Sequence, residues 1–207
     1  MKAKFLFTSL VLSIASIVSY GQEVVLPKPA LSEEATLKYA LENRCSQREY
    51  IESYDIKLQD LSNLLWAGWG YNREGKRTAP SALDRQEITL YVCTHGGTYE
   101  YNAEEHKLIK VSSKDLMQIS GKQPFVETAS VNLIYVCNTD LSASPIMSGV
   151  CCGAISQNIS LYCASAGLAT VVRGSFDANT LKKALKLSDL HEIVLAQSIG
   201  YPAHDNK

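Results

Sequence analysis

The stretch ENRCSQREY places two arginines and a hydroxyl at alternate positions. Guanidinium forks and a serine hydroxyl all donate hydrogen bonds, and they suit the oxygens of a phosphate. Alternate side chains of an extended segment point to one side, so Arg44, Ser46 and Arg48 can converge on one anionic ligand. The alternative is a pair of solvated arginines that bridge Glu42 and Glu49, and the short pattern alone favours this alternative.

Cys45 lies between the two arginines, where positive charge favours a nucleophilic thiolate. Nucleophilic catalysis also needs a neighbouring base, and the sequence shows none there. The sequence has no metal-binding spacing among its four histidines, His95, His106, His191 and His204. Both glycine-rich phosphate loops and the G-x-S-x-G elbow are also missing from it. We therefore predict no metal site and assign no catalytic acid or base.

The chain of 207 residues carries 20 basic and 21 acidic side chains, a net charge of −1. This balance provides no electrostatic surface for nucleic acid or an anionic membrane. The length suits one domain with a substantial core, and 46% hydrophobic residues argue against disorder.

The N-terminal residues differ from the rest of the chain. MKAK is basic, FLFTSLVLSIASIV is apolar, and SYGQE supplies small residues. This order indicates a secretory signal peptide over residues 1–21, followed by a lead-in segment over residues 22–30. We therefore expect an exported protein, periplasmic or secreted, without stable membrane insertion after cleavage. A retained anchor is the alternative, although the apolar run is short for a spanning helix of about 20 residues.

Export would permit disulfides. The six cysteines are Cys45, Cys93, Cys137, Cys151, Cys152 and Cys163, and they show neither C-x-x-C nor zinc spacing. The favoured interpretation is buried thiols that pack like small hydrophobic side chains. A disulfide such as Cys93 to Cys137 stays open as an alternative.

Two helices are expected on either side of the arginine motif. LSEEATLKYALEN predicts a helix over residues 31–43, with Ser32 as its N-cap, which ends immediately before Arg44. KLQDLSNLLWAGWG predicts a second helix over residues 57–70, because apolar residues recur at helical spacing before a closing glycine. A polar loop with glycine and proline follows over residues 71–86.

The strand signals come later in the chain. EITLYVCTHGGTYEYN predicts a hairpin that turns at His95-Gly96-Gly97, with a further strand over residues 108–111. SKDLMQIS predicts a short helix, and SVNLIYVCNT predicts a buried strand. LATVVRGSF and HEIVLAQSIGYP predict two more strands, separated by the amphipathic surface helix DANTLKKALKLS.

Residues 141–172 contain no Asp, Glu, Lys or Arg. Within them, SGVCCGAISQNISLYCASAG predicts a long helix that ends at Gly167. Ser, Asn, Gln and Gly interrupt it too often for a membrane span, so we expect a central helix buried on all sides of a soluble core. Together the elements predict an α+β fold with helices packed on a mostly antiparallel sheet.

These motifs form a series that resembles the nitroreductase-like FMN-dependent family, especially its SagB/ThcOx-type dehydrogenase branch. NRCSQREY resembles the family's R-x-S-x-R flavin-phosphate motif, and LSNLLWAGWGYNREGKRTAPSA resembles the following helix and RTAPSA-type loop. GAISQNISLYCASAGLATVVRGSF resembles the central helix and the next strand, and SIGYP resembles the closing strand. On this resemblance, residues 31–207 are one nitroreductase-like FMN-binding domain.

The resemblance implies a homodimer with FMN at the subunit interface and with the uncharged helix buried inside the dimer. Arg44, Ser46 and Arg48, with Cys45 between them, would then hold the flavin phosphate and ribityl chain. The other matched positions are Pro80, Ser81 and Ala82, facing the flavin of the partner subunit; Gly167 and Leu168, near the ring; and Arg173 and Gly174, with backbone beside flavin N5.

Three positions depart from the family pattern. Asn43 stands where a further arginine often precedes the motif, and Ala169 replaces the last glycine of a G-L-G pattern. A basic residue commonly follows the closing strand, and here only Lys207 could serve. These departures predict weaker FMN binding than is typical of the family.

The function implied is an FMN-dependent oxidoreductase that passes a hydride through bound flavin to a small organic acceptor. Because NAD(P)H is scarce outside the cytoplasm, the alternative is an exported flavin-binding or redox-carrier protein without its own NAD(P)H turnover. A third hypothesis is a secreted interaction domain, stabilised by disulfides, on a degenerate scaffold of this family.

Overall fold

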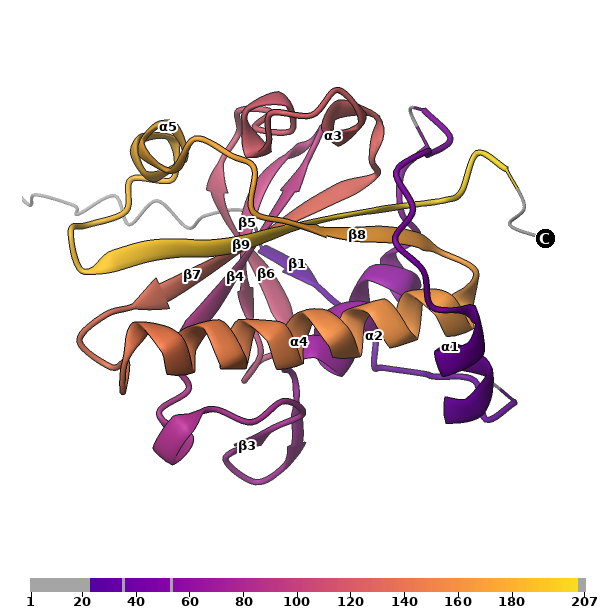
Figure 1. The fold of residues 1–207 in the computed structure, drawn as a ribbon, viewed down its shortest axis with the longest axis horizontal. Helices are drawn as coiled ribbons and strands as arrows, with labels where there is room; N and C mark the ends of the chain where they lie inside the picture. Colours follow the sequence, from indigo (N-terminus) through magenta and orange to yellow (C-terminus); the bar gives the residue numbers. More distant parts are fainter. Residues whose placement is uncertain (1–22, 35, 53, 205–207) are drawn as a thin grey trace, which may run out of the picture.

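The computed structural model describes residues 23–34, 36–52 and 54–204. The expected signal peptide and Lys207 lie outside these residues. Among the described residues, seven strands form one antiparallel sheet in the order β1-β6-β5-β4-β7-β9-β8 (Figure 1). The bounds are β1 Glu23–Val25, β4 Ile88–Thr94, β5 Gly97–Asn102, β6 Lys107–Ser112, β7 Val131–Asn138, β8 Ala169–Arg173 and β9 His191–Gly200.

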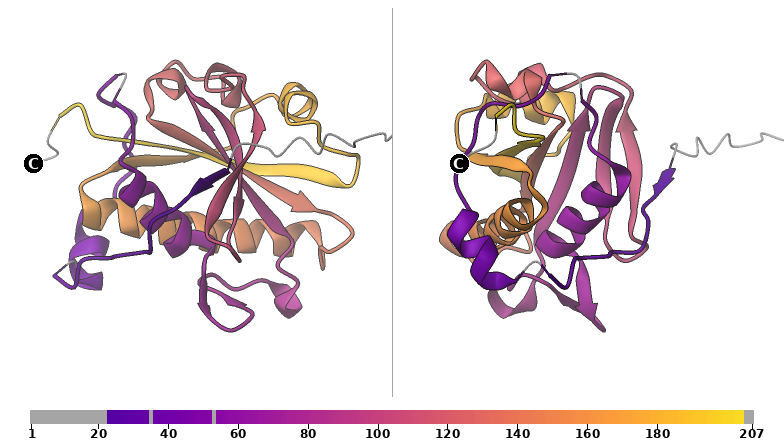
Figure 2. Two further views of the ribbon diagram at one scale, coloured as in Figure 1. Left: turned by 180° about the vertical axis from the view of Figure 1, so that it is seen from behind. Right: turned by 90° about the vertical axis from the view of Figure 1, so that its right-hand side faces the viewer.

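Helices cover both faces of this sheet (Figures 1 and 2). One face carries α2 (Leu58–Trp69) and α4 (Pro145–Ala166), with α1 (Leu37–Asn43) against α4; the other carries α3 (Phe125–Thr128) and α5 (Ala178–Ala184). Side chains of β7 point alternately to the two faces of the sheet. Leu133 and Tyr135 belong to the core under α2 and α4, whereas Ile134 and Val136 belong to the core on the other face.

The helix α4 has clear signals at both ends. Ser144 accepts a hydrogen bond from the backbone N–H of Met147, so the helix begins at Pro145 rather than at the predicted Ser148. Gly167 ends it in the left-handed conformation, with a φ of 69°, as predicted. None of the helices formed by the described residues has the length and hydropathy that a membrane span requires.

Burial of α4 is one-sided in the single chain. Cys152, Ile155 and Ile159 are completely buried, whereas Ile146 and Val150 are 78% and 56% exposed. The expectation of burial on all sides is therefore met on one face only. The helix lacks charge on both faces because it packs one apolar face inside its own chain and leaves a second one open.

The start of α1 corrects a sequence prediction. Thr36 Oγ1 accepts the N–H of Tyr39 at 3.2 Å and is the N-cap. Ser32, the predicted N-cap, instead accepts the N–H of Glu34 in a separate turn. The helix is therefore shorter than expected, although it ends at Asn43, immediately before the arginine motif, as predicted.

Three further segments differ from the prediction in their type of structure. The polar loop contains a small hairpin, β2 (Tyr71–Arg73) and β3 (Lys76–Arg77), followed by the 3-10 turn Ala82–Asp84. SKDLMQIS forms only the 3-10 turn Gln118–Ser120. The lead-in contributes β1, which was not expected because this stretch shows no clear alternation. The hairpin of β4 and β5 forms as predicted.

Five cysteines, Cys93, Cys137, Cys151, Cys152 and Cys163, are buried free thiols. Burial raises the pKa of Cys93 and of Cys151 to about 12. Cys93 and Cys137 cannot pair, because they lie at opposite ends of the β4–β7 ladder and belong to different cores. The favoured interpretation of buried thiols is therefore correct for these five, and the hypothesis of a disulfide-stabilised domain loses its support.

The lead-in is held to the domain by hydrogen bonds from a buried serine and a partly buried histidine. Ser62 Oγ donates to the carbonyl of Pro27 at 2.5 Å, and His106 Nε2 lies 3.1 Å from the same carbonyl. Tyr101 OH is 2.9 Å from His106 Nδ1, an arrangement that suits a neutral imidazole with its proton on Nε2. Burial lowers the pKa of His106.

We predict that His106 makes the domain less stable in acid. Because its folded pKa lies below the ordinary value of 6.5, its stabilising contribution is present above pH 6.5 and is lost as the pH falls through the lower folded pKa. Urea unfolding at pH 7.5 and pH 5 should show a larger loss for wild type than for His106→Gln. The control is His191→Gln, at the start of β9, where the ring contacts only the nearby hydroxyl of Ser188 among the hydrogen bonds described. An equal loss in wild type and His106→Gln would contradict the prediction.

Candidate cofactor site

Residues 44–51, which we call the arginine segment, run along the outer edge of β8 and the chain after β9. The backbone N–H of Gln47 donates to the carbonyl of Thr170 at 2.9 Å, and that of Ile51 donates to the carbonyl of Tyr201 at 2.9 Å. The segment is therefore fixed to the sheet, and its side chains have a defined position.

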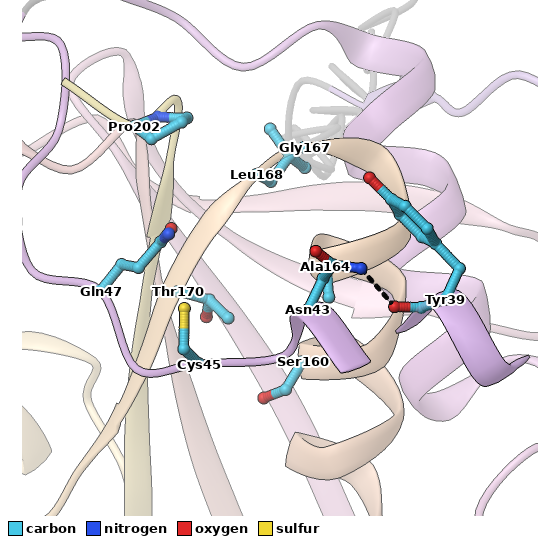
Figure 3. Close-up of a pocket in the computed structure, with 10 residues that line it drawn as sticks. All are labelled: Tyr39, Asn43, Cys45, Gln47, Ser160, Ala164, Gly167, Leu168, Thr170 and Pro202. Atoms are coloured by element: carbon cyan, nitrogen blue, oxygen red, sulfur yellow. Dashed lines mark hydrogen bonds between the residues drawn. The ribbon is translucent and has the colours of Figure 1, made fainter. Parts of the chain in front are cut away.

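A groove lies between this segment, β8 and the end of α4 (Figure 3). Its inner cavity, of about 280 Å³, is lined by Tyr39, Asn43, Cys45, Gln47, Ser160, Ala164, Gly167, Leu168, Thr170 and Pro202. Its outer cavity, of about 410 Å³, is lined by Cys45, Ser46, Gln47, Arg48, Glu49, Pro202 and His204. Because Cys45, Gln47 and Pro202 line both cavities, we treat the two as one site, the edge groove.

The edge groove contains five of the predicted cofactor contacts: Cys45, Ser46, Arg48, Gly167 and Leu168. Arg44 lines neither cavity and is exposed, with its backbone N–H ending α1 by donating to Ala40. We expected Arg44, Ser46 and Arg48 to converge on one ligand. In the structure only Ser46 and Arg48 line the outer cavity together, and Cys45 and Gln47 line both cavities.

The floor of the inner cavity presents hydrogen-bond acceptors. Gln197 Nε2 donates to Thr170 Oγ1 at 2.9 Å and to Ser160 Oγ at 3.3 Å. The two hydroxyls in turn donate to the carbonyls of Ser198 and Ser156. Since both hydroxyl protons are committed, only lone pairs remain for a ligand, and the floor suits a ligand that donates.

Pro80, Ser81 and Ala82 do not line the edge groove of their own chain. Their loop packs beside the middle of α4, where the amide of Asn158 donates to the carbonyl of Thr78 at 3.4 Å. In Figure 1 this loop lies below α4, whereas α1 lies at one end of that helix. The structure thus separates this predicted set from the arginine motif within one chain.

Arg77 fixes this loop by stacking. Its guanidinium carbon lies 4.1 Å from the ring centroid of Tyr71 and 4.8 Å from that of Trp69. Its Nε donates to Gln86 Oε1 at 2.9 Å, and burial lowers its pKa. A cation between two aromatic rings holds the strands β2 and β3 against α2.

Arg173 and Gly174 follow the groove wall at the end of β8. Residues three apart on a strand face opposite sides of a sheet, so Arg173 points away from the face that carries Thr170. The Arg173 side chain is 4% exposed and donates from Nε to Ser198 Oγ at 2.9 Å. Gly174 is exposed.

Among the described residues, no group of three His, Cys, Asp or Glu side chains could hold a metal ion.

Comparison with known proteins assigns the fold to a family. The model of the Nitroreductase family matches residues 41–201. The chain belongs to the nitroreductase family. A Methanocaldococcus jannaschii protein assigned to the nitroreductases is 29% identical over 174 residues, which cover 76% of this chain and 87% of that protein.

Solved structures agree with this assignment. A protein of Ralstonia eutropha JMP134, also assigned to the nitroreductases, is 35% identical with a TM-score of 0.83, covering 90% of this chain and 92% of that chain. The nitroreductase fold expected from the motif series is therefore confirmed. A Desulfovibrio desulfuricans relative, solved in complex with FMN, has 20% identity and a TM-score of 0.64 over 83% of this chain and 88% of its own; this similarity concerns the fold alone.

Sequence reasoning missed several groove residues of this nitroreductase-family chain. Ser160 and Thr170 lie in the uncharged stretch, and Gln197 lies in a strand with mainly apolar neighbours. A polar side chain in a buried element needs a hydrogen-bond partner. This requirement was the only signal in the sequence that these three side chains form a polar site. The sequence could not show that the three side chains meet, because they come from α4, β8 and β9.

We predict that Arg77→Lys destabilises the nitroreductase-family fold despite keeping the charge. The ammonium loses the planar fork and most of the stacking on two rings, so the free energy of unfolding should fall by about 1–2 kcal/mol. Urea unfolding measures the change. The matched control is Arg73→Lys on the same exposed hairpin, and equal stability of wild type and Arg77→Lys would contradict the structural role.

Proposed function

We propose that this chain is an FMN-dependent oxidoreductase that passes a hydride through bound flavin to a small organic acceptor. The edge groove carries the proposal, because it joins anion-binding donors in its outer cavity to hydroxyl acceptors in its inner cavity. Membership of the nitroreductase family and the FMN bound by the Desulfovibrio relative support it. The flavin supplies the redox chemistry, and the protein supplies binding and orientation.

The outer cavity fits the flavin phosphate. Ser46 and Arg48 supply a neutral and a charged donor on the same wall. Glu49 is the carboxylate that would repel a phosphate there, and its Oε2 lies 3.7 Å from His204 Nε2. His204 also lines this cavity, so its imidazole can donate a hydrogen bond beside the carboxylate.

The inner cavity fits the ribityl chain. Ser160 and Thr170 accept hydrogen bonds, and the hydroxyls of a polyol can donate them. This floor suits a phosphate poorly, because the phosphate oxygens would face the lone pairs of Ser160 and Thr170. Asn43, which stands where an arginine is common, donates its amide to the carbonyl of Tyr39 at 2.8 Å and brings no positive charge. This substitution is the physical reason to expect modest FMN affinity.

A second copy of the chain would complete the site. The open apolar face of α4, with Ile146 and Val150, is the surface that we propose for this homodimer. Pro80, Ser81 and Ala82 would then reach the flavin of the partner subunit. Within each chain, Gly167 and Leu168 would lie near the ring, and the backbone of Arg173 and Gly174 would lie beside it.

Two finer assignments are part of the proposal. The RTAPSA loop and the uncharged central helix support placement in the SagB/ThcOx-type branch, with residues 31–207 as the FMN-binding domain. The basic and apolar N-terminal residues support export to the periplasm or beyond. Because NAD(P)H is scarce outside the cytoplasm, the electron donor would be NAD(P)H or another reductant, and the reduction experiment below distinguishes them.

We predict that Val150→Asp converts the homodimer to a monomer and removes bound flavin. A charge placed on the proposed interface must be desolvated, which opposes association. Light scattering after size-exclusion chromatography gives the mass of the assembly. Val111→Asp, on an exposed site of β6, is the control and should stay dimeric. A dimer that persists in Val150→Asp would place the interface elsewhere.

The two arginines should differ in their effect on FMN retention. Arg48→Ala removes a charge-assisted contact of about 1.5–3 kcal/mol, so the Kd for FMN should rise at least tenfold. Arg44→Ala, with a side chain outside both cavities, should have a smaller effect. Flavin fluorescence titration measures both. The reverse order would mean that the phosphate binds on the other side of the motif.

Purification and reduction of the protein test the function itself. The proposal expects yellow protein with releasable FMN, which an anaerobic reductant bleaches and a quinone or nitroaromatic restores. Colourless protein that cannot be reconstituted with FMN would contradict it. Flavin that is bound but inert to NAD(P)H would favour the redox carrier over the NAD(P)H-dependent enzyme.

A further inference from the structure

Arg173 is a buried cation whose hydrogen-bond partners are all neutral. Its Nε donates to Ser198 Oγ at 2.9 Å, its Nη1 to the carbonyl of Ser120 at 3.0 Å, and its Nη2 to Asn132 Oδ1 at 2.9 Å. The loop before α3 is shaped around this group, because a Cβ at Gly121 would overlap Nη1. The three contacts join β8 to β9, β7 and the 3-10 turn.

No negative charge compensates Arg173. Within the part of the chain that the structure describes, no Asp or Glu forms an ion pair with it. Tyr50 and Cys93 would interact with Arg173 if ionised, but burial raises the pKa of both, so they are uncharged near neutral pH. Burial lowers the pKa of Arg173 only to about 10, so the guanidinium keeps its charge.

An uncompensated buried charge costs stability, and three neutral hydrogen bonds offset only part of that cost. A purely structural bridge would be less costly with a neutral side chain or with a carboxylate beside the arginine. The position of the charge suggests what it does. Its side chain lies on the face of the sheet opposite Thr170. Ser198 connects the two, because its Oγ accepts a hydrogen bond from Arg173 Nε and its carbonyl accepts one from the Thr170 hydroxyl that lines the edge groove.

We propose that Arg173 tunes the cofactor: its buried positive charge, held on the opposite face of the sheet, acts across β8 and raises the midpoint potential of the flavin bound in the edge groove. This inference rests on the proposed function. A flavin that takes up a hydride gains one negative charge, and it loses that charge when the acceptor takes the hydride. A fixed cation in a low-dielectric setting therefore favours the reduced form over the oxidised form.

Two variants separate the charge from the structural role of the residue. Arg173→Lys keeps the charge and loses part of the hydrogen bonding, whereas Arg173→Gln loses the charge. In a third variant, Asn132→Asp, a carboxylate of the same shape lies against Nη2 and neutralises the arginine in place. Lys183→Gln, an exposed loss of one positive charge on α5, is the control.

The measurement is the midpoint potential of bound FMN, with thermal unfolding followed in parallel. We expect Arg173→Gln and Asn132→Asp to weaken the binding of reduced FMN at least tenfold relative to the binding of oxidised FMN. This corresponds to a decrease of about 30 mV for a two-electron couple. Arg173→Lys and Lys183→Gln should stay close to wild type.

The outcomes are distinguishable. If Arg173→Gln does not fold, Asn132→Asp decides, because it keeps the arginine. Since it also loses the hydrogen bond from Asn132 Nδ2 to the carbonyl of Val126, its thermal unfolding is measured alongside its potential. Unchanged potentials in the folded charge variants, with lowered stability, would make Arg173 a structural bridge and overturn the inference while the proposed function stands. Wild-type protein that binds no FMN would overturn both.

Discussion

The edge groove exists because backbone hydrogen bonds hold the arginine segment against the sheet. Gln47 bonds to β8, Ile51 bonds to the chain after β9, and Tyr50 OH adds a bond of 3.1 Å to the carbonyl of Gln47. Ordering a residue costs about 1–2 kcal/mol in backbone entropy, so a free loop would present Ser46 and Arg48 poorly. The short α1 ends at Asn43 and directs the chain into this path.

Beneath the groove, the sheet contains several buried polar side chains that contact one another. Gln197, Ser198, Asn132 and Thr170 are all at most 3% exposed, and hydrogen bonds join them to one another or to Arg173. Such groups are tolerated in a core only when they are bonded. Their network fixes β7, β9 and β8 relative to each other and orients the hydroxyls that face the groove. The same bonds therefore stabilise the sheet and fix the floor of the edge groove.

The sequence predicted the elements that are specified locally. The hairpin turns at His95-Gly96-Gly97 and α4 ends at Gly167, because turn and helix-end signals act over a few residues. The prediction failed where distant contacts decide. The N-cap of α1 is Thr36 rather than the predicted Ser32, and one face of α4 is exposed although burial on all sides was expected. In the site, the spacing made Ser46 and Arg48 candidates and the family resemblance assigned them to the flavin phosphate. The roles of Gln197 and of the Arg173 charge depend on partners on other strands.

The central claim is that the outer cavity binds a phosphate and the inner cavity a polyol of the same molecule. Titration of the flavin-free protein with FMN and with riboflavin, which lacks the phosphate, tests this division directly. The account predicts one FMN per chain and an affinity for FMN at least tenfold higher than for riboflavin. Equal affinities, or binding of neither compound, would contradict it.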